Sequence, residues 1–144
     1  MAKFDLHNEI QVKRGVSPVA AAQTDNTAIV SQIVDTLGYG SVEYLILTGS
    51  LADADATFTV LMEDGDASNL SDAVAVADAE LLGTEALAGF TFASDDKVFK
   101  LGYVGNKRYV RVTVTPANNT GAACVAGVWL LGEPALAPTS NPPA

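Results

Sequence analysis

Residues 108–115 read Arg-Tyr-Val-Arg-Val-Thr-Val-Thr, a run in which apolar and polar side chains alternate. Because successive side chains of a β-strand point to opposite faces of a sheet, this pattern predicts a strand. Val110, Val112 and Val114 share one face, and the other face carries Tyr109, Arg111, Thr113 and Thr115. We therefore expect a sheet that is buried on one side and wet on the other.

The same period of two continues on both sides of this strand. Residues 42–47, Val-Glu-Tyr-Leu-Ile-Leu, are apolar on both faces, which favours a central strand, and residues 57–62 alternate cleanly. Further strands are expected over residues 9–13, 27–34, 73–82, 97–103 and 124–131. A short helix over residues 70–82 is the alternative to a strand there. Clusters of Gly, Asn, Asp and Pro separate the runs.

Seven or eight short strands at this spacing predict an all-β protein, an antiparallel β-sandwich of jelly-roll type. At 144 residues the chain is the size of a single domain, which we place at residues 10–132. Residues 1–9 form a predicted N-terminal arm. Residues 133–144 form a Pro-rich C-terminal arm, which is either a disordered end or a segment that lies on a neighbouring sheet edge.

Charge is distributed unevenly along the chain, whose net charge is −9. There is no Lys or Arg between Gly15 and Asp96, whereas five basic residues follow closely: Lys97, Lys100, Lys107, Arg108 and Arg111. An acidic body repels phosphate backbones, so we expect no nucleic-acid partner, while the basic residues suit an acidic protein surface. No run approaches the ~20 apolar residues of a membrane span. Residues 1–8 lack the apolar stretch of a secretory signal, so synthesis in the cytoplasm is expected.

Groups that carry catalysis or bind a cofactor are scarce. His7 is the only histidine and is expected to be a solvated surface residue, and Cys124 is expected to be a small buried hydrophobe. Acidic clusters at 53–55, 63–66 and 95–96 are interpreted as turns, with calcium binding as the alternative. Gly102 to Lys107 lacks a phosphate-binding pattern and is expected to be a hairpin turn. We expect no enzyme, no cofactor and no metal.

Aromatic side chains that stack on sugars are also few. Tyr39, Tyr103, Tyr109 and Trp129 are the candidates, and Trp129 lies in the apolar run Val128-Trp-Leu-Leu, which favours a core position. A carbohydrate-binding jelly-roll module nevertheless remains an alternative, because such folds carry sugar sites on their loops.

Residues 100–116, Lys-Leu-Gly-Tyr-Val-Gly-Asn-Lys-Arg-Tyr-Val-Arg-Val-Thr-Val-Thr-Pro, resemble the capsid decoration (cement) proteins of tailed bacteriophages. Residues 82–84, Leu-Gly-Thr, and 128–132, Val-Trp-Leu-Leu-Gly, followed by Pro134 and Leu136-Ala-Pro138, are similar to the same family. The resemblance covers mainly the second half of the chain.

This resemblance implies a jelly-roll protein on the outside of the virion. Such a protein binds the major capsid protein and itself, with a dimer favoured over a trimer, and reinforces the shell without covalent links. Eight residues are the candidate contacts: Lys97, Lys100, Lys107, Arg108, Arg111, Pro134, Leu136 and Pro138. A head-completion or tail protein is the alternative virion role.

Overall fold

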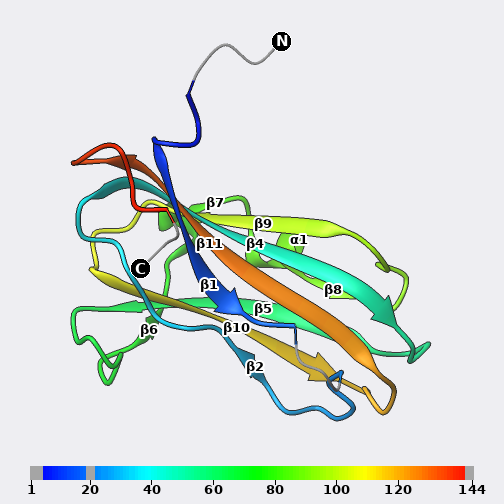
Figure 1. The fold of residues 1–144 in the computed structure, drawn as a ribbon. Helices are drawn as coiled ribbons and strands as arrows, with labels where there is room; N and C mark the ends of the chain where they lie inside the picture. Colours follow the sequence, from blue (N-terminus) through cyan, green and yellow to red (C-terminus); the bar gives the residue numbers. More distant parts are fainter. Residues whose placement is uncertain (1–4, 19–21, 142–144) are drawn as a thin grey trace.

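Two antiparallel β-sheets pack face to face in the computed structural model, which describes residues 5–18 and 22–141 (Figure 1). The five-stranded sheet has the order β1 (Ile10–Val16), β11 (Ala123–Pro134), β4 (Tyr39–Leu51), β9 (Val98–Tyr103) and β7 (Leu81–Leu82). The six-stranded sheet has the order β2 (Ile29–Val30), β10 (Tyr109–Ala117), β5 (Thr57–Gly65) and β6 (Val74–Ala75), with β3 (Val34–Asp35) also on β10 and β8 (Phe90–Thr91) on β5. The all-β sandwich expected from the sequence is confirmed.

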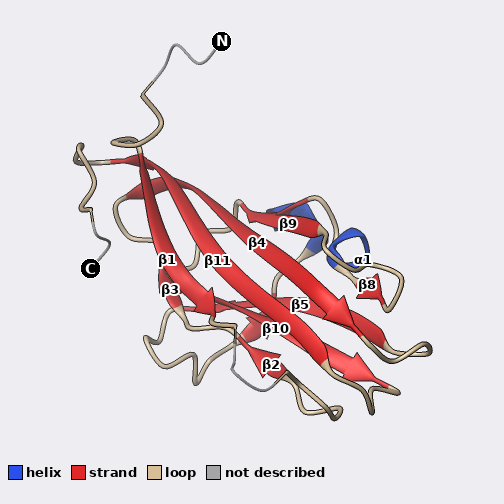
Figure 2. Cartoon of the chain, turned by 45° about the vertical axis from the view of Figure 1, so that its right-hand side comes forward, coloured by secondary structure: helices blue, strands red, loops and turns tan. Residues whose placement is uncertain are grey.

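Within the described residues, helical structure is limited to two short segments beside the sheets (Figure 2). The 3-10 turn η1 (Asp78–Glu80) precedes β7, and α1 (Glu85–Ala88) begins after Thr84, whose hydroxyl accepts a hydrogen bond from the Leu87 amide at 3.1 Å. Among the described residues, no helix has the length and hydropathy needed to cross a membrane.

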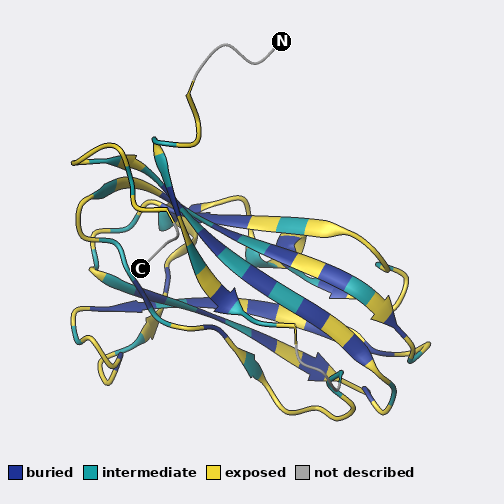
Figure 3. Ribbon diagram, viewed as in Figure 1, coloured by how far each residue is buried: buried dark blue, intermediate teal, exposed yellow. Residues whose placement is uncertain are grey.

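The core lies between the two sheets and is built by the alternation that the sequence predicted (Figure 3). Val110, Val112 and Val114 of β10 are at most 2% exposed, so the predicted inward face of this strand is confirmed. Tyr44 of β4 and Trp129 of β11 meet them from the opposite sheet, with ring centroids 4.5 Å apart. The predictions that β4 is central and that Trp129 is a core residue are also confirmed.

The strand predicted over residues 27–34 is wrong in its continuity, because two short strands, β2 and β3, take its place. Ser31 lies between them. Its amide donates to the Val112 carbonyl, and its hydroxyl accepts from the Val112 amide at 2.9 Å and donates to the Gln32 carbonyl. A side chain thus replaces a main-chain acceptor, which interrupts the ladder while keeping the segment on β10.

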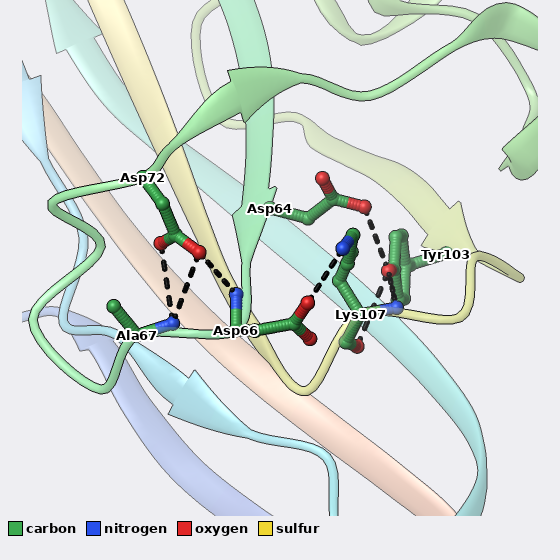
Figure 4. A network of polar contacts seen from close by, with 6 residues as sticks. All are labelled: Asp64, Asp66, Ala67, Asp72, Tyr103 and Lys107. Atoms are coloured by element: carbon green, nitrogen blue, oxygen red, sulfur yellow. Dashed lines mark hydrogen bonds and ion pairs between the residues drawn. The ribbon is translucent and has the colours of Figure 1, made fainter.

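The strand expected over residues 73–82 is largely wrong as well, since most of the segment is loop around β6, η1 and β7. Leu70 has a φ of 52° and is buried, so the chain turns there instead of extending. The Asp72 carboxylate accepts hydrogen bonds from the amides of Asp66 and Ala67 (Figure 4). These contacts fold the loop back onto the end of β5.

The hairpin predicted over Gly102 to Lys107 is wrong, because the segment crosses between sheets. It leaves β9 in the five-stranded sheet and enters β10 in the six-stranded sheet. The Tyr103 hydroxyl accepts from the Lys107 amide at 2.9 Å and donates to the Asp64 carboxylate at 2.8 Å (Figure 4). These bonds direct the chain toward the second sheet.

Cys124 is exposed, so the prediction that it is a buried hydrophobe is wrong. Its neighbours Ala123 and Val125 both point into the core and are 2% and 8% exposed. Alternation along β11 therefore turns the thiol outward, even though the surrounding sequence is apolar.

The described parts of the two ends lie against each other. β11 continues to Pro134, two residues beyond the predicted domain boundary. Past β11, the Thr139 amide donates to the Asn8 carbonyl at 3.1 Å, and the Thr139 hydroxyl donates to the Ile10 carbonyl. Residues 1–4 and 142–144 of the predicted arms lie outside the described residues.

Candidate functional site

The outward side of the five-stranded sheet is apolar. Strand register places its side chains in three rows, each crossing from β1 or β11 towards β9. The first row runs from Val12 through Leu130 and Glu43 to Gly102 and Leu82, the second is Arg14, Val128, Leu45 and Lys100, and the third is Ala126, Leu47 and Val98. We call the eight apolar members the apolar face: Val12, Leu45, Leu47, Leu82, Val98, Ala126, Val128 and Leu130.

Several members of the apolar face are open to solvent. Leu47 is 41% exposed, Leu82 56% and Val98 65%, although each is a large aliphatic side chain in a strand. Single exposed aliphatic residues are ordinary on protein surfaces, but a contiguous sheet face of them indicates an interaction site. The apolar face is therefore the candidate site for binding another macromolecule.

The outward side of the six-stranded sheet differs in composition. It carries threonines along β5 and β10, and the pairing of Thr59 with Thr115 lies within this polar surface. Arg111 and Glu63, also opposite each other in register, form an ion pair of 2.8 Å. Leu61 and Val30 are exposed aliphatic residues on this side. This side is suited to contact with water, and the contrast marks the apolar face as distinctive.

Three charged side chains interrupt the apolar face. Arg14 and Lys100 stand at the two ends of the second row, with Val128 and Leu45 between them. Glu43 stands in the first row, where partial burial raises the pKa of its carboxyl and the nearby Lys100 ammonium opposes that rise. The face is therefore an apolar strip with a cation at either end and one half-buried acid.

Shallow hollows adjoin the apolar face. One of ≈ 510 Å³ lies along β1, between Val12, Pro18 and Val128. Another of ≈ 460 Å³ lies at the β7 and β9 side, between Leu82, Leu87 and Val98. A partner with protruding apolar side chains can fill both hollows while covering the strip between them.

The five basic residues singled out in the sequence do not form one patch. Lys97 and Lys100 are exposed beside and on β9, in the five-stranded sheet. Lys107, Arg108 and Arg111 approach the six-stranded sheet, and each is paired with a carboxylate, respectively Asp66, Asp35 and Glu63. Partner binding by these five residues stays a prediction.

Arg108 shows how closely this second group is tied to its own fold. Its guanidinium donates two hydrogen bonds to Asp35, of 2.9 and 2.7 Å, and lies 5.1 Å from the centre of the Tyr109 ring. The Arg108 hydrogen bonds hold the pKa of Asp35 below its usual value. This ion pair joins β3 to the start of β10.

The three C-terminal candidates lie at the end of β11 and just beyond it. Pro134 is the last residue of β11 and pairs with Tyr39. Leu136 is 87% exposed, and Pro138 is exposed next to Thr139, which binds the N-terminal segment. These positions are available for contact, and their role stays a prediction.

The acidic clusters serve the fold. Asp53 accepts from the amide and the hydroxyl of Thr120 at 2.7 Å each, and Asp95 accepts from the Leu51 amide. Asp64 accepts from Tyr103, and Asp66 pairs with Lys107 (Figure 4). Within residues 5–18 and 22–141, no group of three or more His, Cys, Asp or Glu side chains is placed to hold a metal ion.

His7 is exposed, and its ring nitrogen lies 3.3 Å from the Asn141 amide nitrogen. This contact belongs to the meeting of the two ends. Thr139 and Ser140 line the same small hollow as His7, and their hydroxyls donate to the Ile10 carbonyl and to the Gln11 side chain.

The fold defines the class: an antiparallel β-sandwich of the jelly-roll type found in viral capsid proteins. No known protein family matches the sequence, and no curated protein matches it either. Among solved structures, the chain is similar to a chain in the capsid of Ralstonia phage GP4, with a TM-score of 0.52 and 12% identity, covering 92% of this chain and 89% of that one.

It is also similar to the VP2 subviral particle of infectious bursal disease virus, with a TM-score of 0.53 and 10% identity, covering 88% of this chain and 32% of that one. A xylan-binding module of the CBM15 type gives a TM-score of only 0.44, at 13% identity over 92% of this chain and 96% of that module. At these identities the likeness shows the fold alone.

Sequence reasoning missed the apolar face although the signal was present. Residues 42–47 of β4 are apolar on both sides, which was interpreted as the mark of a central strand, and β11 is apolar on both sides as well. They are central within their sheet, yet nothing in the described chain covers their outward side completely. Two-sided hydrophobicity in a two-layer sandwich therefore indicated an exposed apolar sheet face.

Proposed function

We propose that this chain is a structural virion protein that decorates the outside of a tailed-phage capsid and bridges its subunits without covalent links. The observation that carries the proposal is the fold likeness to a chain of a phage capsid, which spans nearly the whole length of both chains. The sequence resemblance to decoration proteins over residues 100–116 supports the same role.

The physical basis is interface area. A shell packed with nucleic acid pushes its subunits apart, and a protein bound only to the assembled state stabilises that state. A decoration protein therefore needs a rigid scaffold and a surface whose burial in the interface is favourable. It needs no active site. The two-sheet core supplies the scaffold, and the apolar face supplies the surface.

Bridging requires that each decorating unit touch more than one shell subunit. Self-association, expected as a dimer, gives a unit with two shell-binding surfaces. The open edge of β1 and the C-terminal residues offer further contact area. Within this proposal the major capsid protein and a second copy are the partners, and the chain has no enzymatic role.

The two alternatives differ in what they require. A head-completion or tail protein is present in few copies at one position, whereas a decoration protein approaches the shell protein in number. A carbohydrate-binding module needs several exposed aromatic rings. Trp129 and Tyr103 are buried and Tyr39 and Tyr109 are half-buried, so Phe92, 42% exposed, is the one exposed ring among the described residues. No contact in the described chain favours either alternative.

The test is the composition of purified particles. A stained gel, with mass spectrometry to identify the band, gives the copy number of this chain relative to the major capsid protein. We expect comparable abundance and removal of the chain by mild washing or protease without opening the shell. A few copies per particle would support a head-completion or tail role, and absence from particles would refute the proposal.

A further inference from the structure

We propose that the apolar face is the surface by which this chain binds the shell. The shell surface that it contacts has an apolar strip that lies between carboxylates. This inference rests on the proposed function and names the contact surface and the chemistry of its partner. It follows from three properties of the face: its open aliphatic side chains, the placement of unpaired cations on it, and the position of Glu43.

The cations are the first indication of what covers the face. Lys107, Arg108 and Arg111 are neutralised by carboxylates on the six-stranded sheet. Within residues 5–18 and 22–141, no carboxylate lies at ion-pair distance from Arg14 or Lys100, and the Arg14 guanidinium donates only to the Ser17 hydroxyl, at 3.3 Å. Arg14 and Lys100 are thus two of the four unpaired cations among these residues, and both lie on the apolar face, whereas Lys13 points to the other side of β1 and Lys97 precedes β9.

Spacing makes the expected partner more specific. Arg14 and Lys100 occupy the ends of one row, separated by three strand-to-strand steps across β11 and β4. Neighbouring strands lie about 4.8 Å apart, so the two Cα atoms are about 14 Å apart. The complementary surface therefore has apolar side chains opposite Val128 and Leu45, with carboxylates on either side.

A second copy of this chain fits the face less well. Packing two apolar faces together brings two Arg14 and two Lys100 side chains into one interface with only the two Glu43 carboxylates to offset them. Like charges in a desolvated interface cost free energy. An acidic shell surface satisfies both cations and leaves only Glu43 to be offset, which Lys100 already does in part.

Nucleic acid is the other ligand that cations attract. The net charge of −9 and the long stretch without Lys or Arg repel a phosphate backbone that extends beyond the face itself. The aliphatic rows also provide no aromatic ring for base stacking. A protein surface uses both the aliphatic and the cationic parts of the face.

Glu43 distinguishes the two protein partners. Against an acidic shell surface, Glu43→Gln removes a repulsive carboxylate and should tighten binding. In a face-to-face pair of copies, Glu43 is the only acid available to the partner's cations, so the same substitution should weaken association. Glu43→Gln thus changes binding affinity in opposite directions for the two partners: binding to an acidic shell becomes tighter, and face-to-face association of two copies becomes weaker.

The experiment is co-sedimentation with undecorated shells, assembled from the purified major capsid protein of the same phage. Leu47→Thr with Val98→Thr makes the apolar face polar while keeping strand-forming residues. Leu61→Thr with Val30→Thr is the matched control on the opposite sheet, again one leucine and one valine at exposed positions. Circular dichroism melts confirm that each variant is folded.

A second pair of variants tests charge. Arg14→Gln with Lys100→Gln removes two positive charges from the face, and Thr57→Glu with Thr115→Glu makes the same change in net charge on the other sheet. We expect both face variants to bind about tenfold more weakly than wild type, with controls close to wild type. We expect Glu43→Gln to bind more tightly.

The outcomes separate the two proposals. If wild type fails to sediment with shells, the proposed function fails. If wild type binds and the face variants bind equally well, the decorating role stands and this inference is overturned. Weaker self-association of Glu43→Gln and of the face variants in analytical ultracentrifugation, with unchanged shell binding, would assign the face to a second copy instead. Binding of duplex DNA that Arg14→Gln with Lys100→Gln abolishes would assign it to nucleic acid.

Discussion

The Tyr103 hydroxyl donates a hydrogen bond of 2.8 Å to the Asp64 carboxylate, joining the end of β9 in one sheet to β5 in the other (Figure 4). Both residues are buried, at 4% and 3% exposed. The same hydroxyl accepts from the Lys107 amide, so one tyrosine side chain organises the crossing between the sheets.

Replacing this tyrosine should therefore destabilise the fold. Tyr103→Phe leaves a buried carboxylate and a main-chain amide without their partner, which should cost about 1–3 kcal/mol of unfolding free energy. Tyr109→Phe is the control, because Tyr109 is half-buried and β10 keeps its register. Urea denaturation followed by circular dichroism measures the unfolding free energy of both variants. Equal stability of the two variants would show that the hydroxyl contacts add nothing.

The same residue predicts a loss of stability in alkali. Burial, and then the hydrogen bond to Asp64, raise the pKa of Tyr103 above its ordinary value of about 10, and burial raises the pKa of Tyr44 as well. Because the unfolded chain releases these protons first, their contribution is complete below pH ~10 and is lost as pH rises further. Thermal melts between pH 8 and 11 should show the melting temperature fall as pH rises. The fall should be smaller for Tyr103→Phe than for wild type.

Two neighbouring acids should respond oppositely to removal of their charge. Hydrogen bonds from Thr120 hold the pKa of Asp53 well below its usual range, whereas proximity to Asp53 raises the pKa of Asp55. Asp53 thus stabilises the fold above the unfolded-state pKa of about 3.9, and this contribution is lost as pH falls. Asp53→Asn should lower the melting temperature at pH 7 and flatten its acid dependence. Asp55→Asn should leave the melting temperature unchanged or raise it.

Where the sequence predicted the fold well, the determinants were local. Alternation alone placed Val112 inward and Thr113 outward, because the period of two is a property of the strand itself. Two of the errors arose where a side chain reaches a residue far away in the chain. Ser31 interrupts a strand through Val112, which is 81 positions later, and Tyr103 redirects the chain through Asp64, 39 positions earlier.

The candidate site was predictable only in part for a related reason. The sequence shows that residues 42–47 are apolar on both faces, but it does not show whether a third layer covers the second face. Lys100 was recognised as a candidate contact from the clustering of charge. Arg14 was not, because its place opposite Lys100 depends on the register of four strands.

The inward face of β10 gives a direct check of the core. Val112→Asp buries an unpaired charge and should cost several kcal/mol, a large part of the roughly 5–15 kcal/mol that stabilises a domain. Thr113→Asp, one residue away and pointing outward, should cost much less. Chemical denaturation that gave similar losses for both variants would contradict the assignment of the two faces.

Arg108 and Arg111 should matter more for stability than for attachment. Arg108→Gln with Arg111→Gln leaves Asp35 and Glu63 without their ion-pair partners, so the melting temperature should fall. Shell binding by the folded double variant should stay within about twofold of wild type, because both side chains lie at the six-stranded sheet and are already paired with carboxylates of this chain. A large loss of binding in co-sedimentation, with unchanged stability, would instead support the direct contact that the sequence suggested.

The most direct measurement is a cryo-electron microscopy reconstruction of undecorated shells before and after addition of the purified protein. The predicted result is added density on the outer surface, into which the sandwich fits with β1, β11, β4 and β9 facing the shell and the threonine-rich sheet facing solvent. No added density outside the shell would contradict the decorating role. Density with the six-stranded sheet against the shell would contradict the assignment of the apolar face as the shell-binding surface.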